Sequence, residues 1–218
     1  MGFLTINLNF TGRPALLVGA GAVGKRKLAA LLEAGAAVTV VEPKPDPAVS
    51  EMAQSGLIRL VPEFSDSLLE SGPVVFVATD DSELSRQIAR AAGAQGLLLN
   101  VADCPRECNF LMPAIVDLSP LRLAVTTEGA SPALAAHLAA DFRVRYLGHG
   151  LLAKLLGRLR PLILEADLDP NIRSGIFKAL AANGQLPELL LANRLAEATE
   201  IVGLLIEPVK LPGDFSLV

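Results

Sequence analysis

The chain has 218 residues, a formal net charge of −4 and a hydrophobic fraction of 51%. This length can form one domain of ordinary size and a smaller second one, with a substantial buried core. The acidic balance argues against a general nucleic-acid-binding protein, because such proteins carry an excess of lysine and arginine.

Other classes are also excluded by pattern. The first residues lack the basic segment, apolar run and cleavage site of a secretory signal peptide. The most apolar C-terminal stretch, residues 151–164, is interrupted by basic residues and a proline, so we expect no membrane span and a cytoplasmic protein. Two cysteines are too few for a disulfide framework, and their spacing to the two histidines matches no recognised zinc pattern. We therefore expect reduced thiols and no metal.

The first elements lead into a glycine-rich turn. Apolar residues alternate over residues 3–10, which predicts an edge strand. Residues 15–18 form a short apolar run typical of a buried strand, and residues 22–33 carry leucines at helical spacing. Between them, Gly19, Gly21 and Gly24 have the spacing GxGxxG, which is typical of a turn that binds a dinucleotide.

Each glycine has an expected role. The first permits a tight turn, the second lets a pyrophosphate approach the backbone, and the third lets the helix pack closely on its strand. The pyrophosphate would bind the free N–H groups at the start of the helix. The predicted cofactor contacts in this turn are Gly19, Gly21, Ala22, Val23 and Gly24. The alternative is a glycine-bearing turn that binds nothing.

A carboxylate follows the second predicted strand. Residues 37–41 form an apolar, β-branched run, and Glu42 comes directly after it. This is the position, about twenty residues beyond the glycines, where an acidic side chain accepts hydrogen bonds from the ribose hydroxyls of NAD. A 2′-phosphate would be repelled there, so the sequence favours NAD over NADP.

Strands and helices continue to alternate up to residue 101. We expect a helix over residues 48–55, a strand over 57–61, a strand over 73–78, a helix over 83–93 capped by Ser82, and a strand over 96–101. This alternation predicts a parallel sheet covered by helices on both faces. Ligands of such sheets bind at the carboxyl ends of the strands, so we add four cofactor contacts that follow or end strands: Thr79, Asp80, Asn100 and Val101.

The second half has a different character. Residues 121–127 alternate as in a strand, and a turn follows in which Ser131 is the expected N-cap of a helix with Pro132 at its first position. Three further helices are expected over residues 151–167, 171–182 and 186–205.

Three segments resemble the precorrin-2 dehydrogenase family, which includes the N-terminal module of bacterial siroheme synthase. They are residues 100–105 (Asn-Val-Ala-Asp-Cys-Pro), 109–115 (Asn-Phe-Leu-Met-Pro-Ala-Ile) and 127–135 (Thr-Glu-Gly-Ala-Ser-Pro-Ala-Leu-Ala). With the glycine turn, they occur in order and at family-like spacing over residues 3–150. Several motifs in order are more specific than any one of them.

The resemblance implies an activity and a set of partners. It implies NAD-dependent oxidation of the tetrapyrrole precorrin-2 to sirohydrochlorin, in some members with insertion of Fe²⁺, and a homodimer that interlocks from Pro113 onward. It also aligns Asp103 with the catalytic aspartate of the family and Thr127 with a hydroxyl residue near the tetrapyrrole pocket. Ser131 and Arg106 are further candidates to bind the substrate carboxylates. On the residues alone, the preferred interpretation of Asp103 is a turn aspartate bonded to nearby amides.

Together these expectations define an α/β chain in three parts. They are a Rossmann-type NAD-binding domain over residues 1–113, a small α+β dimerisation segment over 114–148 and a C-terminal helical domain over 149–218. Glu128 departs from the family pattern, because many relatives have a glycine there. Two alternatives stay open, since a fold alone does not define a reaction: a non-enzymatic NAD-sensing module, and another NAD-dependent oxidoreductase.

Overall fold

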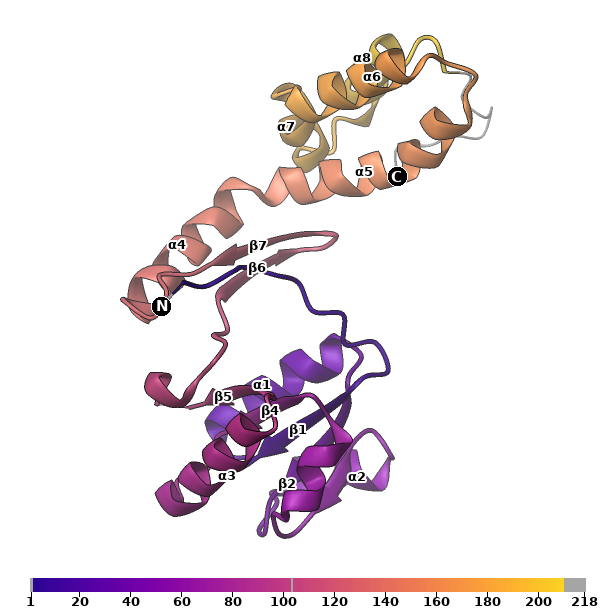
Figure 1. Ribbon diagram of the computed structural model, residues 1–218. Coiled ribbons are helices and arrows are strands. Elements are labelled where there is room, and N and C mark those ends of the chain that lie inside the picture. Colours follow the sequence, from indigo (N-terminus) through magenta and orange to yellow (C-terminus); the bar gives the residue numbers. More distant parts are fainter. Residues whose placement is uncertain (1, 103, 210–218) are drawn as a thin grey trace. The chain divides into compact units, whose positions relative to one another are not determined.

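The computed structural model describes residues 2–102 and 104–209. The chain divides into two compact units, with the division between Met112 and Pro113. Figure 1 shows a mixed α/β unit followed by a second unit that is mostly helical. The finer division of the second half at residue 148 stays a prediction.

The first unit contains a five-stranded parallel sheet with the order β3-β2-β1-β4-β5. Its strands are β1 (Pro14–Val18), β2 (Ala37–Val41), β3 (Arg59–Val61), β4 (Val74–Val77) and β5 (Leu98–Val101). The order reverses between β1 and β4, which is the arrangement of a Rossmann-type sheet. The predicted α/β class and its five parallel strands are confirmed.

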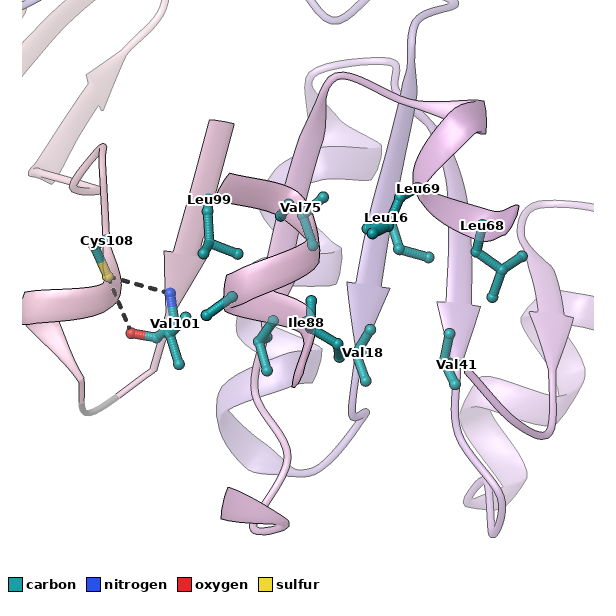
Figure 2. Close-up of a cluster of buried hydrophobic side chains, with 13 residues drawn as sticks. Leu16, Val18, Val41, Leu68, Leu69, Val75, Ile88, Leu99, Val101 and Cys108 are labelled. Atoms are coloured by element: carbon teal, nitrogen blue, oxygen red, sulfur yellow. Dashed lines mark hydrogen bonds between the residues drawn. The ribbon is translucent and has the colours of Figure 1, made fainter. Parts of the chain in front are cut away.

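Helices cover both faces of this sheet, because successive side chains of a strand point to opposite faces. On one face, Leu16 and Val18 pack with Ile88 of α3 (Ser82–Ala94) (Figure 2). On the other, Leu17 packs with Leu28 of α1 (Ala22–Glu33) and with α2 (Pro47–Gln54). Two 3₁₀ helices, Asp66–Ser71 and Pro105–Glu107, complete the unit.

Two local predictions in this unit are wrong. Residues 2–10 do not form a strand, and Leu4 and Ile6 lie exposed. An alternating pattern forms a strand only where it pairs with a neighbouring strand. Both edges of β1, the strand that follows in the chain, are already paired with β2 and β4. The N-cap of α3 is Asp81 instead of Ser82, because the Asp81 carboxylate accepts hydrogen bonds from two backbone N–H groups, each at 3.0 Å.

Over its described residues, 113–209, the second unit joins a hairpin to five helices. The antiparallel strands are β6 (Ala114–Leu118) and β7 (Leu121–Val125). The helices are α4 (Pro132–Arg145), α5 (Leu147–Glu165), α6 (Pro170–Ala182), α7 (Gln185–Leu191) and α8 (Leu195–Leu205). No helix of the described residues is both long and apolar enough to cross a membrane.

The structure corrects two expectations and confirms one here. The strand β6 was not predicted, and the helix expected over residues 186–205 is two helices separated near Asn193, which has a left-handed φ of 56°. Ser131 is the N-cap of α4, as predicted, since its hydroxyl accepts a hydrogen bond from the N–H of Leu134 at 3.2 Å.

Helix α5 begins earlier than predicted, because two glycines that look like breaks are packing contacts. A Cβ on Gly148 would overlap the carbonyl oxygen of Pro187, and one on Gly150 would lie 2.5 Å from the carbonyl oxygen of Leu118. The glycines therefore let α5 approach α7 and β6 closely. Farther along α5, Leu159 and Ile163 lie fully buried in the helical core.

We predict opposite effects for two alanine substitutions in α5. Gly148→Ala should destabilise the protein by about 1–3 kcal/mol, because the new methyl group overlaps the Pro187 carbonyl. Gly157→Ala is the matched control in the same helix, with no atom within 4 Å of the new Cβ. It should stabilise by about 0.5–1 kcal/mol. Thermal unfolding measures both, and equal shifts in Tm would contradict the packing role.

Candidate functional site

The glycine turn after β1 is shaped by two close backbone contacts. Gly19 has a left-handed φ of 91°, and a Cβ there would overlap the carbonyl oxygen of Ala78. A Cβ on Gly24 would overlap the carbonyl oxygen of Gly19. These two positions therefore admit only glycine, for the turn and for the approach of α1 to the sheet respectively, which agrees with the roles predicted for them.

Gly21 has a different environment from its neighbours. It is the N-cap of α1 with an ordinary φ of −65°, and an added Cβ would meet no atom within 4 Å. No side chain caps this helix, and its first turn holds no acidic residue. The N–H groups at the start of α1 are thus left for an anion, and the space beside Gly21 is open to it.

Glu42 closes the other side of the turn. One carboxylate oxygen, Oε2, accepts a hydrogen bond from the N–H of Ala20 at 2.8 Å, and Oε1 accepts one from Lys44 at 3.0 Å. These bonds hold a half-buried negative charge beside the glycine turn. Each oxygen keeps a lone pair with which it can accept a hydroxyl of a ribose.

An ion pair joins the elements around Glu42. The Lys25 ammonium of α1 lies 2.5 Å from the carboxylate of Asp46, the N-cap of α2. The hydrogen bond from Lys25 lowers the pKa of Asp46 below its usual value, and the N–H of Val49 acts in the same direction. Lys25 is therefore engaged with the N-cap of α2.

The carboxyl ends of β4 and β5 lie at the same edge. The N–H of Ala78 donates to Val18 at 2.7 Å, and the N–H of Ala102 donates to Val77 at 2.8 Å. Thr79, half-buried, and Asp80, exposed, therefore follow β4 directly beside the glycine turn. The structure thus gathers at one edge the predicted contacts of the turn with Glu42, Thr79 and Asp80.

Asn100 and Val101 lie deeper than an edge position. The Val101 side chain belongs to the core under α3, and its backbone N–H and C=O both bond to the thiol of Cys108 (Figure 2). The Asn100 amide is buried and accepts a hydrogen bond from the ammonium of Lys27 at 2.6 Å. The sequence does not mark Lys27 as buried, because the apolar neighbours Phe76 and Met112 lie far from it along the chain.

Asp103, the predicted base, lies outside the described residues, so its assignment stays a prediction. The residues before and after it are held to the sheet edge: Ala102 bonds to Val77, and the N–H of Cys104 donates to Val101 at 3.4 Å. Arg106 follows in the 3₁₀ helix and is exposed.

In the second unit, the predicted substrate contacts share one turn. The hydroxyl of Thr127 accepts a hydrogen bond from the N–H of Ser131 at 2.9 Å. Glu128, between them, has a left-handed φ of 52°, a conformation that glycine adopts at little cost. This agrees with the glycine that the family resemblance places there. Across the described residues, no three histidine, cysteine or carboxylate side chains converge as metal ligands.

Comparisons with known proteins agree with a dinucleotide-binding first unit. A family model described as "Putative NAD(P)-binding" matches residues 6–114. The siroheme synthase of Nitrosococcus oceani is 41% identical over 200 residues, which cover 91% of this chain and 42% of the relative. That of Methylococcus capsulatus is 39% identical over 206 residues, covering 93% and 43%. The chain thus spans less than half the length of these relatives.

A solved structure also resembles the whole fold. The structure titled "SirC, precorrin-2 dehydrogenase" matches with a TM-score of 0.77 and 24% identity, covering 94% of this chain and all of that one. At this identity the likeness establishes the fold, including the helical second unit.

We predict that Gly21 is needed for NAD binding, whereas Gly24 is needed for the stability of the fold. Gly21→Ala should unfold at the wild-type Tm but bind NAD weakly, because the new methyl group occupies only the space that the pyrophosphate would use. Gly24→Ala, the control, should lower Tm, because its Cβ overlaps the Gly19 carbonyl. Calorimetric NAD titration and thermal unfolding measure these effects. Unchanged NAD affinity in Gly21→Ala would place the cofactor elsewhere.

Proposed function

The chain belongs to the NAD(P)-binding family whose model matches residues 6–114, and from that premise we propose that it is an NAD-dependent dehydrogenase that oxidises precorrin-2 to sirohydrochlorin. One observation carries this proposal: the match to siroheme synthases extends over 200 residues, far beyond the first unit. The similarity therefore includes the second unit, which carries the Thr127 turn, as well as the dinucleotide site.

The preference for NAD over NADP rests on Glu42. Its carboxylate is anchored by two backbone N–H groups and cannot turn away without breaking both bonds. A 2′-phosphate at this place would put two negative charges in contact, whereas ribose hydroxyls can donate to the carboxylate.

The oxidation removes a hydride and a proton from the macrocycle. Bound NAD would supply the hydride acceptor, so the protein must orient a carbon of the substrate and accept the proton. We assign the proton to the carboxylate of Asp103, in line with the family resemblance.

We assign the substrate carboxylates to hydroxyl and guanidinium groups. The oxygens of Thr127 and Ser131 each accept a bond from a backbone N–H, so the hydroxyl hydrogens point away from that backbone and can donate to a carboxylate. Arg106 would add a cation, which pairs strongly with carboxylates. The insertion of Fe²⁺ and the cytoplasmic location stay predictions.

We also propose that the protein acts as a homodimer through β6, β7 and α4. The core of this segment holds only Val116, Leu118 and Ala139 as buried members, and a two-stranded sheet is marginal by itself. Apolar side chains remain exposed on it, among them Val144 at 79% and Leu134 at 48%. A second copy of the chain would bury this surface, as the family resemblance implies.

Turnover tests the proposed reaction. The purified protein should convert precorrin-2 with NAD, and much more slowly with NADP, as followed by absorbance. Asp103→Asn should lower kcat by about 10²–10⁴-fold, because it removes a general base. NAD affinity should stay unchanged, because the proposal assigns Asp103 to the proton and not to the cofactor. Absence of wild-type turnover despite NAD binding would favour the NAD-sensing alternative, and normal turnover of Asp103→Asn would refute the base.

Light scattering after size exclusion tests the dimer. The wild type should have twice the mass of one chain. Val144→Asp should shift it towards the monomer, because an unpaired charge would be buried in the interface. Leu57→Asp changes an exposed leucine of the first unit in the same way and should leave the mass unchanged. A monomeric wild type would rule the dimer out.

A further inference from the structure

An ion pair joins α1 to the start of α2 beside the glycine turn. The ammonium of Lys25 lies 2.5 Å from the oxygen Oδ2 of Asp46, and the two side chains are 46% and 36% exposed. Exposed pairs of this kind contribute little to the stability of a fold. The consequence of this pair lies in where it holds the ammonium.

The ammonium belongs to the N-terminal end of α1, where the chain offers it no anion. The helix dipole makes this end positive, and the first turn of α1 has neither an acidic residue nor a side-chain cap. Lys25 is the fourth residue of the helix, and its N–H donates to the carbonyl of Gly21 at 2.8 Å. A lysine there gains from a nearby anion, either a phosphate of a ligand or a carboxylate of the chain. In the structure the anion is the carboxylate of Asp46.

Asp46 is fixed in place by the helix that it caps. Its oxygen Oδ1 accepts a hydrogen bond from the N–H of Val49 at 2.9 Å. Its backbone lies between Pro45 and Pro47, which restrict the chain on both sides. The oxygen Oδ2 stays available to Lys25, whose hydrogen bond lowers the pKa of Asp46 below its usual value. Asp46 is therefore a negative charge with a defined position.

Glu42, at the other end of the same loop, occupies a place that also suits a phosphate. The backbone N–H groups of Ala20 and Lys44 donate to its carboxylate at 2.8 and 3.0 Å. The exposed side chain of Lys44 adds a cation to this loop. Backbone N–H groups together with cations are the partners that phosphates bind. Without the Glu42 carboxylate, both N–H donors would be open to the 2′-phosphate of NADP.

We propose that Asp46 is a second determinant of cofactor choice, because it pairs with the Lys25 ammonium that would otherwise be available to the 2′-phosphate of NADP. Glu42 occupies the N–H donors that this phosphate needs, and Asp46 neutralises a cation that would attract it. NAD has a hydroxyl in place of the phosphate and loses nothing by the pairing. This inference rests on the proposed function, since it concerns the cofactor of the same site.

Calorimetric titration with NADP and with NAD tests this role. The background is Glu42→Ser, in which the two N–H donors are free. Adding Asp46→Asn should lower the Kd for NADP about three- to fivefold, which is the effect of one exposed charge pair. The Kd for NAD should change by less than about twofold. Asparagine caps helices as well as aspartate does, so α2 keeps its N-cap.

Two controls separate the ion pair from a general change of charge. Adding Lys25→Met to Glu42→Ser/Asp46→Asn should return the Kd for NADP to that of Glu42→Ser, because the released ammonium is then absent. Glu51→Gln in the Glu42→Ser background removes an exposed carboxylate of the same helix, α2. It should leave the Kd for NADP unchanged.

The proposal and the proposed reaction fail separately, because the titrations need no precorrin-2. An unchanged Kd for NADP on adding Asp46→Asn, an equal gain from Glu51→Gln, or a gain that survives Lys25→Met would overturn the role of Asp46. The expected gain in a protein that binds NAD but has no turnover would support that role and refute the dehydrogenase. If circular dichroism shows that Asp46→Asn does not fold, Asp46→Ser, which also caps a helix, takes its place.

Discussion

The contact between Gly19 and the carbonyl of Ala78 is the constraint on which the candidate site depends. It lets the chain leaving β1 turn over the end of β4, at the point where the strand order reverses. Gly24 then brings α1 against the same turn, and the N–H groups at the start of the helix point into open space beside Gly21. Because the strands are parallel, the carboxylate of Glu42 reaches this place from the neighbouring strand. The shape of the candidate dinucleotide site therefore depends on backbone packing at Gly19 and Gly24.

The edge of β5 shows a second constraint, the need to cover a free strand. A sixth strand would satisfy the edge fully, but residues 104–112 bond to it instead with the Cys108 thiol and with the side-chain amide and backbone N–H of Asn109. Behind this edge the Asn100 amide accepts a hydrogen bond from the Lys27 ammonium and donates one to the C=O of Phe110. Irregular backbone at the carboxyl edge of a sheet is where α/β proteins commonly hold reacting groups.

The second unit has two separate hydrophobic clusters of different size. Helices α5 to α8 share a continuous apolar core, whereas β6, β7 and α4 enclose only a few buried side chains. The turn of Thr127 and Ser131 lies in the less enclosed part, and hydrogen bonds within the turn hold its hydroxyl groups. Glu128 has a left-handed backbone conformation in that turn, at the position where many relatives have a glycine. The likeness to siroheme synthases covers 91% of the chain and so includes residues of both units.

The sequence by itself determined the elements whose signals are local. Glycine spacing, apolar runs and capping residues predicted β1, α1, β2 and the start of α4 closely, and with them the glycine turn and Glu42. Only the tertiary structure decided the features that depend on a distant partner. Residues 2–10 have the alternating pattern of a strand but pair with no other strand. Gly148 lies within helix α5, where it contacts Pro187, and does not end a helix. Nothing near Lys27 in the sequence indicates burial; its buried contacts come from Asn100 of β5 and from Met112. Pairing and burial are properties of two segments at once, and a pattern within one segment cannot contain them.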